Sequence, residues 1–288
     1  MVRCLCCTRG ANAVYWKPTG ERIDSMELCD KLRQRRGFIC DMDGVIYHGN
    51  RLLPGAKEFV DWLQREDKKY LFLTNSSERS PRELRQKLQR LGIEVAEEHF
   101  YTSALATAAF LASQCPGGSV YVIGEAGLIN ALYNAGLSIN DMNPDYVVVG
   151  ETRSYSFEKV EQAINLVIRG AKLIGTNPDV TGPVERGITP ACGALIAPIQ
   201  LSTGMKPYFV GKPNPLMMRS ALKQLGVRRE EAFIIGDRMD TDIIAGIESE
   251  IETILLLSGV TAREELGSFP YQPHHVLDGI GDVPGACG

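Results

Sequence analysis

The chain has 288 residues, of which 44% are hydrophobic and 23% are charged, and its formal net charge is -4 at pH 7. These proportions are typical of a globular protein, and the length suits one large domain or two modest ones. The acidic balance argues against a basic face for nucleic acid and against a polybasic membrane anchor. No apolar run approaches the roughly 18 residues that span a bilayer. We therefore expect no nucleic acid polymer and no membrane among the partners.

Residues 1–36 form an N-terminal extension that we expect to be disordered or partly helical and to lie outside the fold. Within it, "SMELCDKLRQRRG" predicts one short helix capped at Ser25. The extension holds half of the eight cysteines, and the others are scattered singly, so the spacing is not that of a secreted disulfide scaffold. We expect reduced thiols and a cytoplasmic location.

From Gly37 onward, short apolar runs alternate with amphipathic helical patterns. The runs predict strands at Phe38–Cys40, Tyr70–Leu73, Val120–Ile123, Tyr146–Val149, Lys172–Ile174, Tyr208–Val210, Phe233–Ile235 and Thr253–Leu257. Helices are predicted at "PGAKEFVDWLQRED", at "SPRELRQKLQRLG" with a capping box, and at "NPLMMRSALKQLG". This alternation indicates an α/β fold with a doubly wound, Rossmann-like parallel sheet.

Four of the predicted strands end in polar residues that could carry chemistry. These residues are Asp41 and Asp43 in "FICDMDG", Thr74 and Asn75 in "YLFLTN", Lys212 in "YFVGKPNP", and Asp237 and Asp242 in "FIIGDRMDTD". Parallel sheets place their sites at the carboxyl ends of strands, so we expect these side chains to meet. The strands between Val120 and Ile174 end differently, which indicates a second α/β unit inserted into the first. We expect residues 37–113 and 207–288 to form the catalytic core and residues 114–206 to form a cap.

The converging residues suit phosphoryl transfer. Carboxylates at one edge of a sheet make an all-oxygen site, and Mg²⁺ is the usual ion beside phosphate. The hydroxyl of Thr74, the amide of Asn75 and the ammonium of Lys212 can hold phosphate oxygens. Asp41 is then the nucleophile that takes the phosphoryl group, and Asp43 exchanges protons with the leaving group and with water.

Four sequence motifs resemble those of the haloacid dehalogenase (HAD) superfamily of phosphatases. They are "DMDGVIY", "LTNSS", "GKPNP" and "GDRMDTDIIAG", in the order of the subclass (IIA) that has a large α/β cap between the second and third motifs. "YTSALATAAFL", "VGETRSYSFEKV", "TNPD" and "PACGALIAPI" further resemble the NagD or 4-nitrophenylphosphatase-like branch. The resemblance runs from about Gly37 to near Pro273 and does not cover residues 1–36.

The resemblance implies a role for each motif residue. Asp41 would be nucleophile and metal ligand, Asp43 acid/base and ligand through its backbone carbonyl, Thr74 and Asn75 phosphate binders, Lys212 the residue that orients the phosphate, Asp237 a Mg²⁺ ligand, and Asp242 a support of the metal through water. The loops of the cap offer mixed polar groups for substrate selection, with Asn177 and Asp179 foremost, and no cluster of Arg or Lys for a second phosphate. A homo-oligomer formed through the cap is common in related proteins.

These observations favour a Mg²⁺-dependent phosphomonoesterase. Its expected partners are small phosphorylated metabolites, nucleoside monophosphates or sugar phosphates, hydrolysed through an aspartyl phosphate. Two alternatives stay open at this level. A phosphotransferase or phosphomutase would use the same nucleophile and differ only in excluding water from the intermediate. A non-catalytic phosphate-binding protein would lack the nucleophile or the lysine, and this chain has both.

Overall fold

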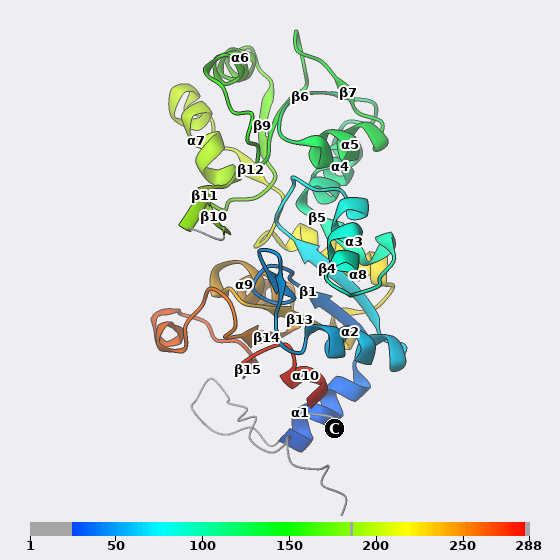
Figure 1. Ribbon diagram of the computed structural model, residues 1–288. Coiled ribbons are helices and arrows are strands. Elements are labelled where there is room, and N and C mark those ends of the chain that lie inside the picture. Colours follow the sequence, from blue (N-terminus) through cyan, green and yellow to red (C-terminus); the bar gives the residue numbers. More distant parts are fainter. Residues whose placement is uncertain (1–24, 185–186, 286–288) are drawn as a thin grey trace, which may run out of the picture.

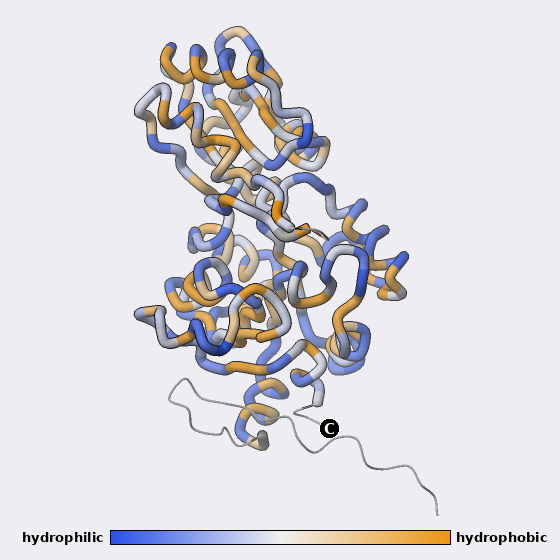
Figure 2. The backbone as a smooth tube through the Cα atoms, turned by 60° about the vertical axis from the view of Figure 1, so that its left-hand side comes forward, coloured by the Kyte–Doolittle hydropathy of each residue, from blue (hydrophilic) through white to orange (hydrophobic). Residues whose placement is uncertain are grey.

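The computed structural model describes residues 25–184 and 187–285, which form two α/β units stacked one above the other (Figure 1). The expectations for the first 24 residues lie outside the described part of the chain. Within the described ranges, no helix is both long enough and apolar enough to cross a membrane. Figure 2 shows hydrophobic stretches running through both units.

The lower unit is built on a six-stranded sheet in which every neighbouring pair of strands is parallel. The spatial order is β15 (His275–Leu277), β14 (Glu252–Leu256), β13 (Ala232–Gly236), β1 (Gly37–Cys40), β4 (Lys69–Thr74) and β5 (Phe100–Thr102). β1 therefore lies in the middle, between β13 and β4. This order confirms the predicted parallel sheet and brings the ends of β1, β4 and β13 side by side.

Both faces of this sheet are covered, because successive residues of a strand point to opposite faces. Phe38 and Cys40 of β1 pack into one apolar cluster, and Ile39 packs into another. The helices of the lower unit are α1 (Ser25–Gln34), α2 (Ala56–Arg65), α3 (Pro81–Arg90), α4 (Ser103–Gln114), α8 (Pro215–Leu225), α9 (Ile244–Glu248) and α10 (Asp282–Gly285). α1, α2 and α3 contribute to the first cluster, and α4 and α8 contribute to the second.

The ends of α3 and α8 follow the predicted signals. Ser80 caps α3 by accepting from the backbone N–H of Glu83, whose carboxylate accepts in turn from the backbone of Ser80. Asn214 caps α8, and Gly226 ends it in the left-handed conformation with φ of 61°. These caps fix where each helix starts relative to the preceding strand or loop.

α1 forms within the predicted segment, but it belongs to the fold, contrary to our expectation. Leu28 and Leu32 are fully buried in the first apolar cluster. Lys31 and Arg35 contact the carboxylate of Glu252 at the start of β14, at 3.1 and 2.6 Å. The spacing of the two leucines gives the helix one apolar side, and that side is buried against the core.

The upper unit contains a second, five-stranded sheet. Its parallel strands follow the order β12 (Tyr208–Phe209), β9 (Lys172–Gly175), β8 (Tyr146–Val149), β6 (Ser119–Ile123) and β7 (Ser138–Ile139). Its helices are α5 (Ala126–Asn134), α6 (Phe157–Ile168) and α7 (Cys192–Thr203), and an antiparallel hairpin joins β10 (Thr181–Val184) to β11 (Gly187–Pro190). β12 lies just after the predicted end of the insert at residue 206 and pairs with β9.

Several short strands were not predicted from the sequence patterns. They are the edge strands β5 and β15, the small strand β7, the hairpin β10–β11, and the hairpin of β2 (Tyr47–His48) with β3 (Arg51–Leu52). Runs of two to four residues are too short to show a period.

Candidate active site

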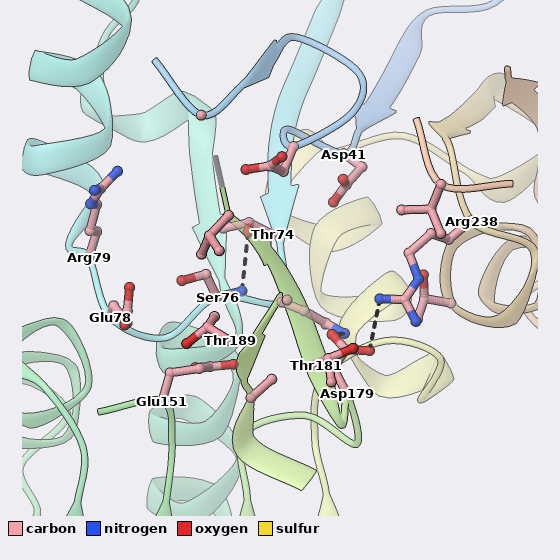
Figure 3. Close-up of a pocket in the computed structure, with 18 of the residues that line it drawn as sticks. Asp41, Thr74, Ser76, Glu78, Arg79, Glu151, Asp179, Thr181, Thr189 and Arg238 are labelled. Carbon is pink, nitrogen blue, oxygen red and sulfur yellow. Dashed lines mark hydrogen bonds and ion pairs between the residues drawn. The ribbon is translucent and has the colours of Figure 1, made fainter. Parts of the chain in front are cut away.

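The predicted strand-end residues gather between the two units. Asp41 directly follows β1, Thr74 ends β4, and Asp237 directly follows β13, so three neighbouring strands deliver them to one edge. Lys212 enters from the loop between β12 and α8, and Asp242 lies in a turn of π-helix at Met239–Ile243. Figure 3 shows Asp41 and Thr74 close together in the pocket that they line.

Lys212 is the central contact of the site. Its ammonium donates to Oδ1 of Asp41 and, at 2.6 Å, to Oδ1 of Asp242. The side chains of Lys212 and Asp242 are only 3% and 1% exposed. Burial alone would lower the pKa of Lys212, but the carboxylates of Asp242 and Asp41 hold that pKa above its usual value. The lysine therefore stays charged and is fixed against the predicted nucleophile.

Three carboxylates cluster beside this ammonium, which contacts two of them, Asp41 and Asp242. Asp41, Asp237 and Asp242 each place an oxygen within 4.8 Å of the others. Burial raises the pKa of Asp41, and the neighbouring carboxylates add to that rise against the pull of Lys212. Burial and then the charge of Asp242 raise the pKa of Asp237 to about 7. A divalent cation fits this donor set, because it is all oxygen and holds more negative charge than one lysine offsets.

Glycine is required behind the carboxylates. The backbone N–H of Val260 donates to Oδ2 of Asp237 at 2.8 Å, which orients that side chain. A Cβ at Gly259 would lie 1.9 Å from this oxygen, and a Cβ at Gly44 would lie 2.3 Å from it. Gly44 also has φ of 81°, in the region that disfavours other residues. The motif glycines thus let two loops close around Asp237.

Asp43 projects into the open space beside these residues. Its side chain is 42% exposed, yet its Oδ1 is buried and accepts no hydrogen bond within the described chain. The imidazole of His48 lies beside it, with Nδ1 3.6 Å from that oxygen. Burial raises the pKa of Asp43. A carboxyl with a free oxygen and a raised pKa is suited to carry a proton.

The side chain of Asn75 holds the backbone of Lys212 in place. Its Oδ1 accepts from the backbone N–H of Lys212 at 2.8 Å, and its Nδ2 donates to the backbone carbonyl of Lys212 at 3.0 Å. The side chain is only 9% exposed, although it lines the pocket. Thr74 holds the next turn, since its hydroxyl accepts from the backbone N–H of Ser76 at 3.1 Å. Thr74 and Ser76 line the pocket beside Asn75 (Figure 3).

The predicted cap residues Asn177 and Asp179, and Glu151 near them, differ in what they face. Asp179 and Glu151 line the pocket, whereas Asn177 is fully buried and does not. Nδ2 of Asn177 donates to the backbone carbonyl of Asn75 at 2.8 Å and also to Glu151. Glu151 accepts from the backbone N–H of Ser77 at 3.0 Å. Asn177 therefore joins the upper unit to the lower one.

The pocket between the two units has a volume of about 480 Å³, which is suited to a small metabolite. Sequence reasoning missed several of its polar side chains, among them Arg79, Lys87, Thr181, Thr189 and Arg238. Arg238 follows Asp237 directly and reaches Asp179 at 3.4 Å (Figure 3). Lys87 lies within "SPRELRQKLQRLG" and Arg79 directly precedes it. The sequence pattern identifies this segment only as a surface helix and gives no sign that either residue faces a pocket.

Comparisons with known proteins agree on one family. Residues 38–138 match the model described as "Haloacid dehalogenase-like hydrolase", and residues 209–283 match a second one described as HAD-hydrolase-like. The chain is similar to the dihydroxyacetone phosphatase of Corynebacterium glutamicum, with 46% identity over 85% of this chain and 90% of that protein. It is 43% identical to the ribonucleotide monophosphatase NagD of Escherichia coli, over 86% of this chain and 98% of that one.

Solved structures give the same result. The structure of NagD from Escherichia coli K-12 matches with a TM-score of 0.82 and 42% identity, and the match covers 86% of this chain and 98% of that one. The 4-nitrophenylphosphatase from Thermotoga maritima matches with a TM-score of 0.86 and 32% identity, over 90% and 99% of the two chains. Both the lower and the upper unit are thus part of a shared architecture.

Proposed function

We propose that this chain hydrolyses small phosphorylated metabolites with Mg²⁺. It belongs to the haloacid dehalogenase-like hydrolases and is a phosphatase acting on phosphoric monoesters. Nucleoside monophosphates and sugar phosphates are the expected substrates, because similar proteins are named for ribonucleotide and sugar phosphates. The observation that carries the proposal is the contact of one buried lysine with two of three clustered carboxylates on the pocket wall.

In the first step, a carboxylate oxygen of Asp41 attacks the phosphorus atom and the ester P–O bond breaks. Lys212 holds Oδ1 of Asp41, which leaves Oδ2 for the attack. The departing oxygen takes a proton from Asp43. Thr74, Asn75 and Lys212 hold the remaining phosphoryl oxygens, with Ser76 beside them, so that the transferred group stays in line with the bond that breaks.

In the second step, water attacks the phosphorus of the aspartyl phosphate. Asp43, now ionised, accepts a proton from that water as the bond between phosphorus and the Asp41 oxygen breaks. Inorganic phosphate leaves, and both aspartates return to their starting forms. The feature that supports this double role is the partly exposed side chain of Asp43, whose buried Oδ1 has no hydrogen-bond partner within the described chain.

The proposed ligands of Mg²⁺ are the side chains of Asp41 and Asp237 and the backbone carbonyl of Asp43, with Asp242 as a support through water. When bound, the ion neutralises charge on the phosphoryl oxygens. The proposal also assigns residues 37–113 and 207–288 to catalysis and residues 114–206 to a cap that selects substrates. We also propose that the protein is cytoplasmic and forms a homo-oligomer through the cap.

The test is a panel of phosphate esters assayed with Mg²⁺ and ranked by kcat/KM. Nucleoside monophosphates, sugar phosphates and 4-nitrophenyl phosphate should release phosphate, whereas phosphoproteins and lipid phosphates should release little. The Asp41→Asn variant serves as the matched control, because it removes the nucleophile at nearly constant volume. Equal rates for wild type and this control would refute the covalent mechanism.

A further inference from the structure

Two cations on the pocket wall have no part in the mechanism above. Lys87 comes from α3, and Arg79 comes from the loop just before that helix. Lys87 is only 7% exposed, and its ammonium lies 3.3 Å from the centre of the Tyr47 ring. Arg79 is exposed at the same side of the pocket. Both belong to the lower unit, outside the inserted segment that we expected to select the substrate.

Neither cation has a carboxylate partner among the described residues. No Asp or Glu oxygen of residues 25–184 or 187–285 lies within 4.0 Å of a charged nitrogen of Arg79 or Lys87. The other two basic side chains deep in the site differ in this respect, because Lys212 contacts Asp41 and Arg238 contacts Asp179. Burying an ammonium against an aromatic ring, without a carboxylate within ion-pair distance, is costly to the fold.

The electrostatics of Lys87 reflect this lack of a partner. Burial first, and then repulsion from Arg79, lower the pKa of Lys87 to about 8, although the charge of Asp43 opposes this fall. An anion placed between the two cations would stabilise both charges. The pocket is the open space onto which both residues face, so such an anion would come from the ligand.

The two cations lie on the leaving-group side of the site. Figure 3 shows Arg79 and Arg238 on opposite sides of the pocket, with Asp41 and Thr74 between them. Lys87 lies against the ring of Tyr47, and Tyr47 pairs with Asp43 in a β-bridge, so Lys87 lies beside the loop that carries Asp43. Asp43 is the residue that protonates the leaving oxygen in the proposed mechanism. A group bound by these cations would therefore belong to the alcohol part of the ester.

We propose that Arg79 and Lys87 form a second anion subsite, and that preferred substrates carry a carboxylate or a further phosphate on the leaving group. This inference rests on the proposed phosphatase function and ranks esters with an anionic leaving group, such as phosphorylated sugar acids, above the neutral sugar phosphates and nucleoside monophosphates that the same site accepts. Glu78 lines the same wall and opposes the subsite, since its carboxylate would repel the same anion. A variant that removes this charge, Glu78→Gln, should therefore strengthen the preference for anionic esters, whereas loss of Arg79 or Lys87 should weaken it.

The experiment compares matched esters on the full chain with Mg²⁺. Glycerol 3-phosphate and 3-phosphoglycerate differ only in a carboxylate, and so do sorbitol 6-phosphate and 6-phosphogluconate at a longer reach. Glycerol 1,3-bisphosphate tests a phosphate in place of the carboxylate. The readout is the ratio of kcat/KM for each anionic ester to that for its neutral counterpart. Lys87→Met and Arg79→Gln should each lower this ratio tenfold or more in at least one series, as expected for a charge-assisted hydrogen bond.

The controls separate this subsite from other effects. Arg82→Gln removes a charge from the exposed side of the same helix, outside the pocket, and should leave the ratio within about twofold of wild type. Glu78→Gln should raise the ratio. Equal losses on neutral and anionic esters in Lys87→Met and Arg79→Gln would overturn the subsite, because both cations would then serve Asp43. No hydrolysis of any ester, 4-nitrophenyl phosphate included, would instead refute the proposed function.

Discussion

The carboxylate of Asp179 in the upper unit accepts a hydrogen bond of 2.9 Å from the side chain of Asn75 in the lower unit. The same side-chain amide of Asn75 also hydrogen-bonds to the backbone N–H and the backbone carbonyl of Lys212. A residue of the predicted cap is therefore one hydrogen-bonded step away from the lysine that contacts Asp41. Asn75 therefore couples the upper unit to Lys212 through hydrogen bonds to both.

This coupling predicts the behaviour of Asn177→Ala. The variant loses the hydrogen bonds to the backbone carbonyl of Asn75 and to Glu151, at a cost of about 1–3 kcal/mol. Because Asn177 does not line the pocket, we expect kcat/KM to fall by a similar factor for every ester in the panel. Thr189→Val, on the hairpin that lines the pocket, should instead change the ranking. A reordered panel for Asn177→Ala would show that this residue selects substrates.

Asp41→Asn should reduce turnover to less than a few per cent of wild type. The change removes the attacking carboxylate and leaves the volume of the side chain nearly unchanged. Far-ultraviolet circular dichroism would check that the variant is folded, and release of 4-nitrophenol would measure its activity. A folded variant with substantial turnover would contradict a nucleophilic role for Asp41.

Lys212→Met should lower both activity and stability. It leaves Asp41, Asp237 and Asp242 clustered without their cation, and loss of one partner of a buried ion pair costs about 3–5 kcal/mol. Denaturant unfolding without metal measures this loss. The double variant Lys212→Met with Asp242→Asn should recover part of it, because it also removes one of the repelling carboxylates. An unchanged midpoint for the single variant would show that the lysine is not electrostatically important.

Removal of divalent metal should abolish hydrolysis, and Mg²⁺ should restore it. Dialysis against EDTA followed by titration with Mg²⁺ measures both effects. The melting temperature should also rise with Mg²⁺, because an ion that binds only the folded chain stabilises it. Asp237→Asn should weaken this thermal shift. Full activity after exhaustive chelation would exclude the metal assignment.

Acid should weaken the attachment of α1 through Glu252. Although burial tends to raise the pKa of this carboxyl, hydrogen bonds from His275, Arg35 and Lys31 hold it well below its ordinary value of 4.5. A folded-state pKa below the unfolded one gives stability that is present above about pH 4.5 and is lost as the pH falls further. Urea unfolding between pH 6 and pH 3 should therefore show a steeper loss for wild type than for Glu252→Gln. Parallel curves would rule out this contribution.

The sequence alone was sufficient for the fold class and for the strand-end residues. Apolar runs at Tyr146–Val149 and Phe233–Ile235 are buried strands, and the caps at Ser80 and Asn214 start helices where the local pattern placed them. These features depend on contacts within a few residues, which the order of residue types records directly. Strand ends of a parallel sheet must meet at one edge, so Asp41, Thr74 and Asp237 could be brought together without coordinates.

The tertiary structure alone decided what each side chain faces. Nothing local distinguishes Asn177, which ties the two units together, from Asp179, which lines the pocket two residues later. Leu28 and Leu32 make an apolar side for α1, yet only the packing shows that the core receives it. Lys87 reads as one more charge on a polar helix, and its burial against Tyr47 depends on a hairpin forty residues away. Such roles are set by contacts between distant segments, and periodicity along the chain carries no record of them.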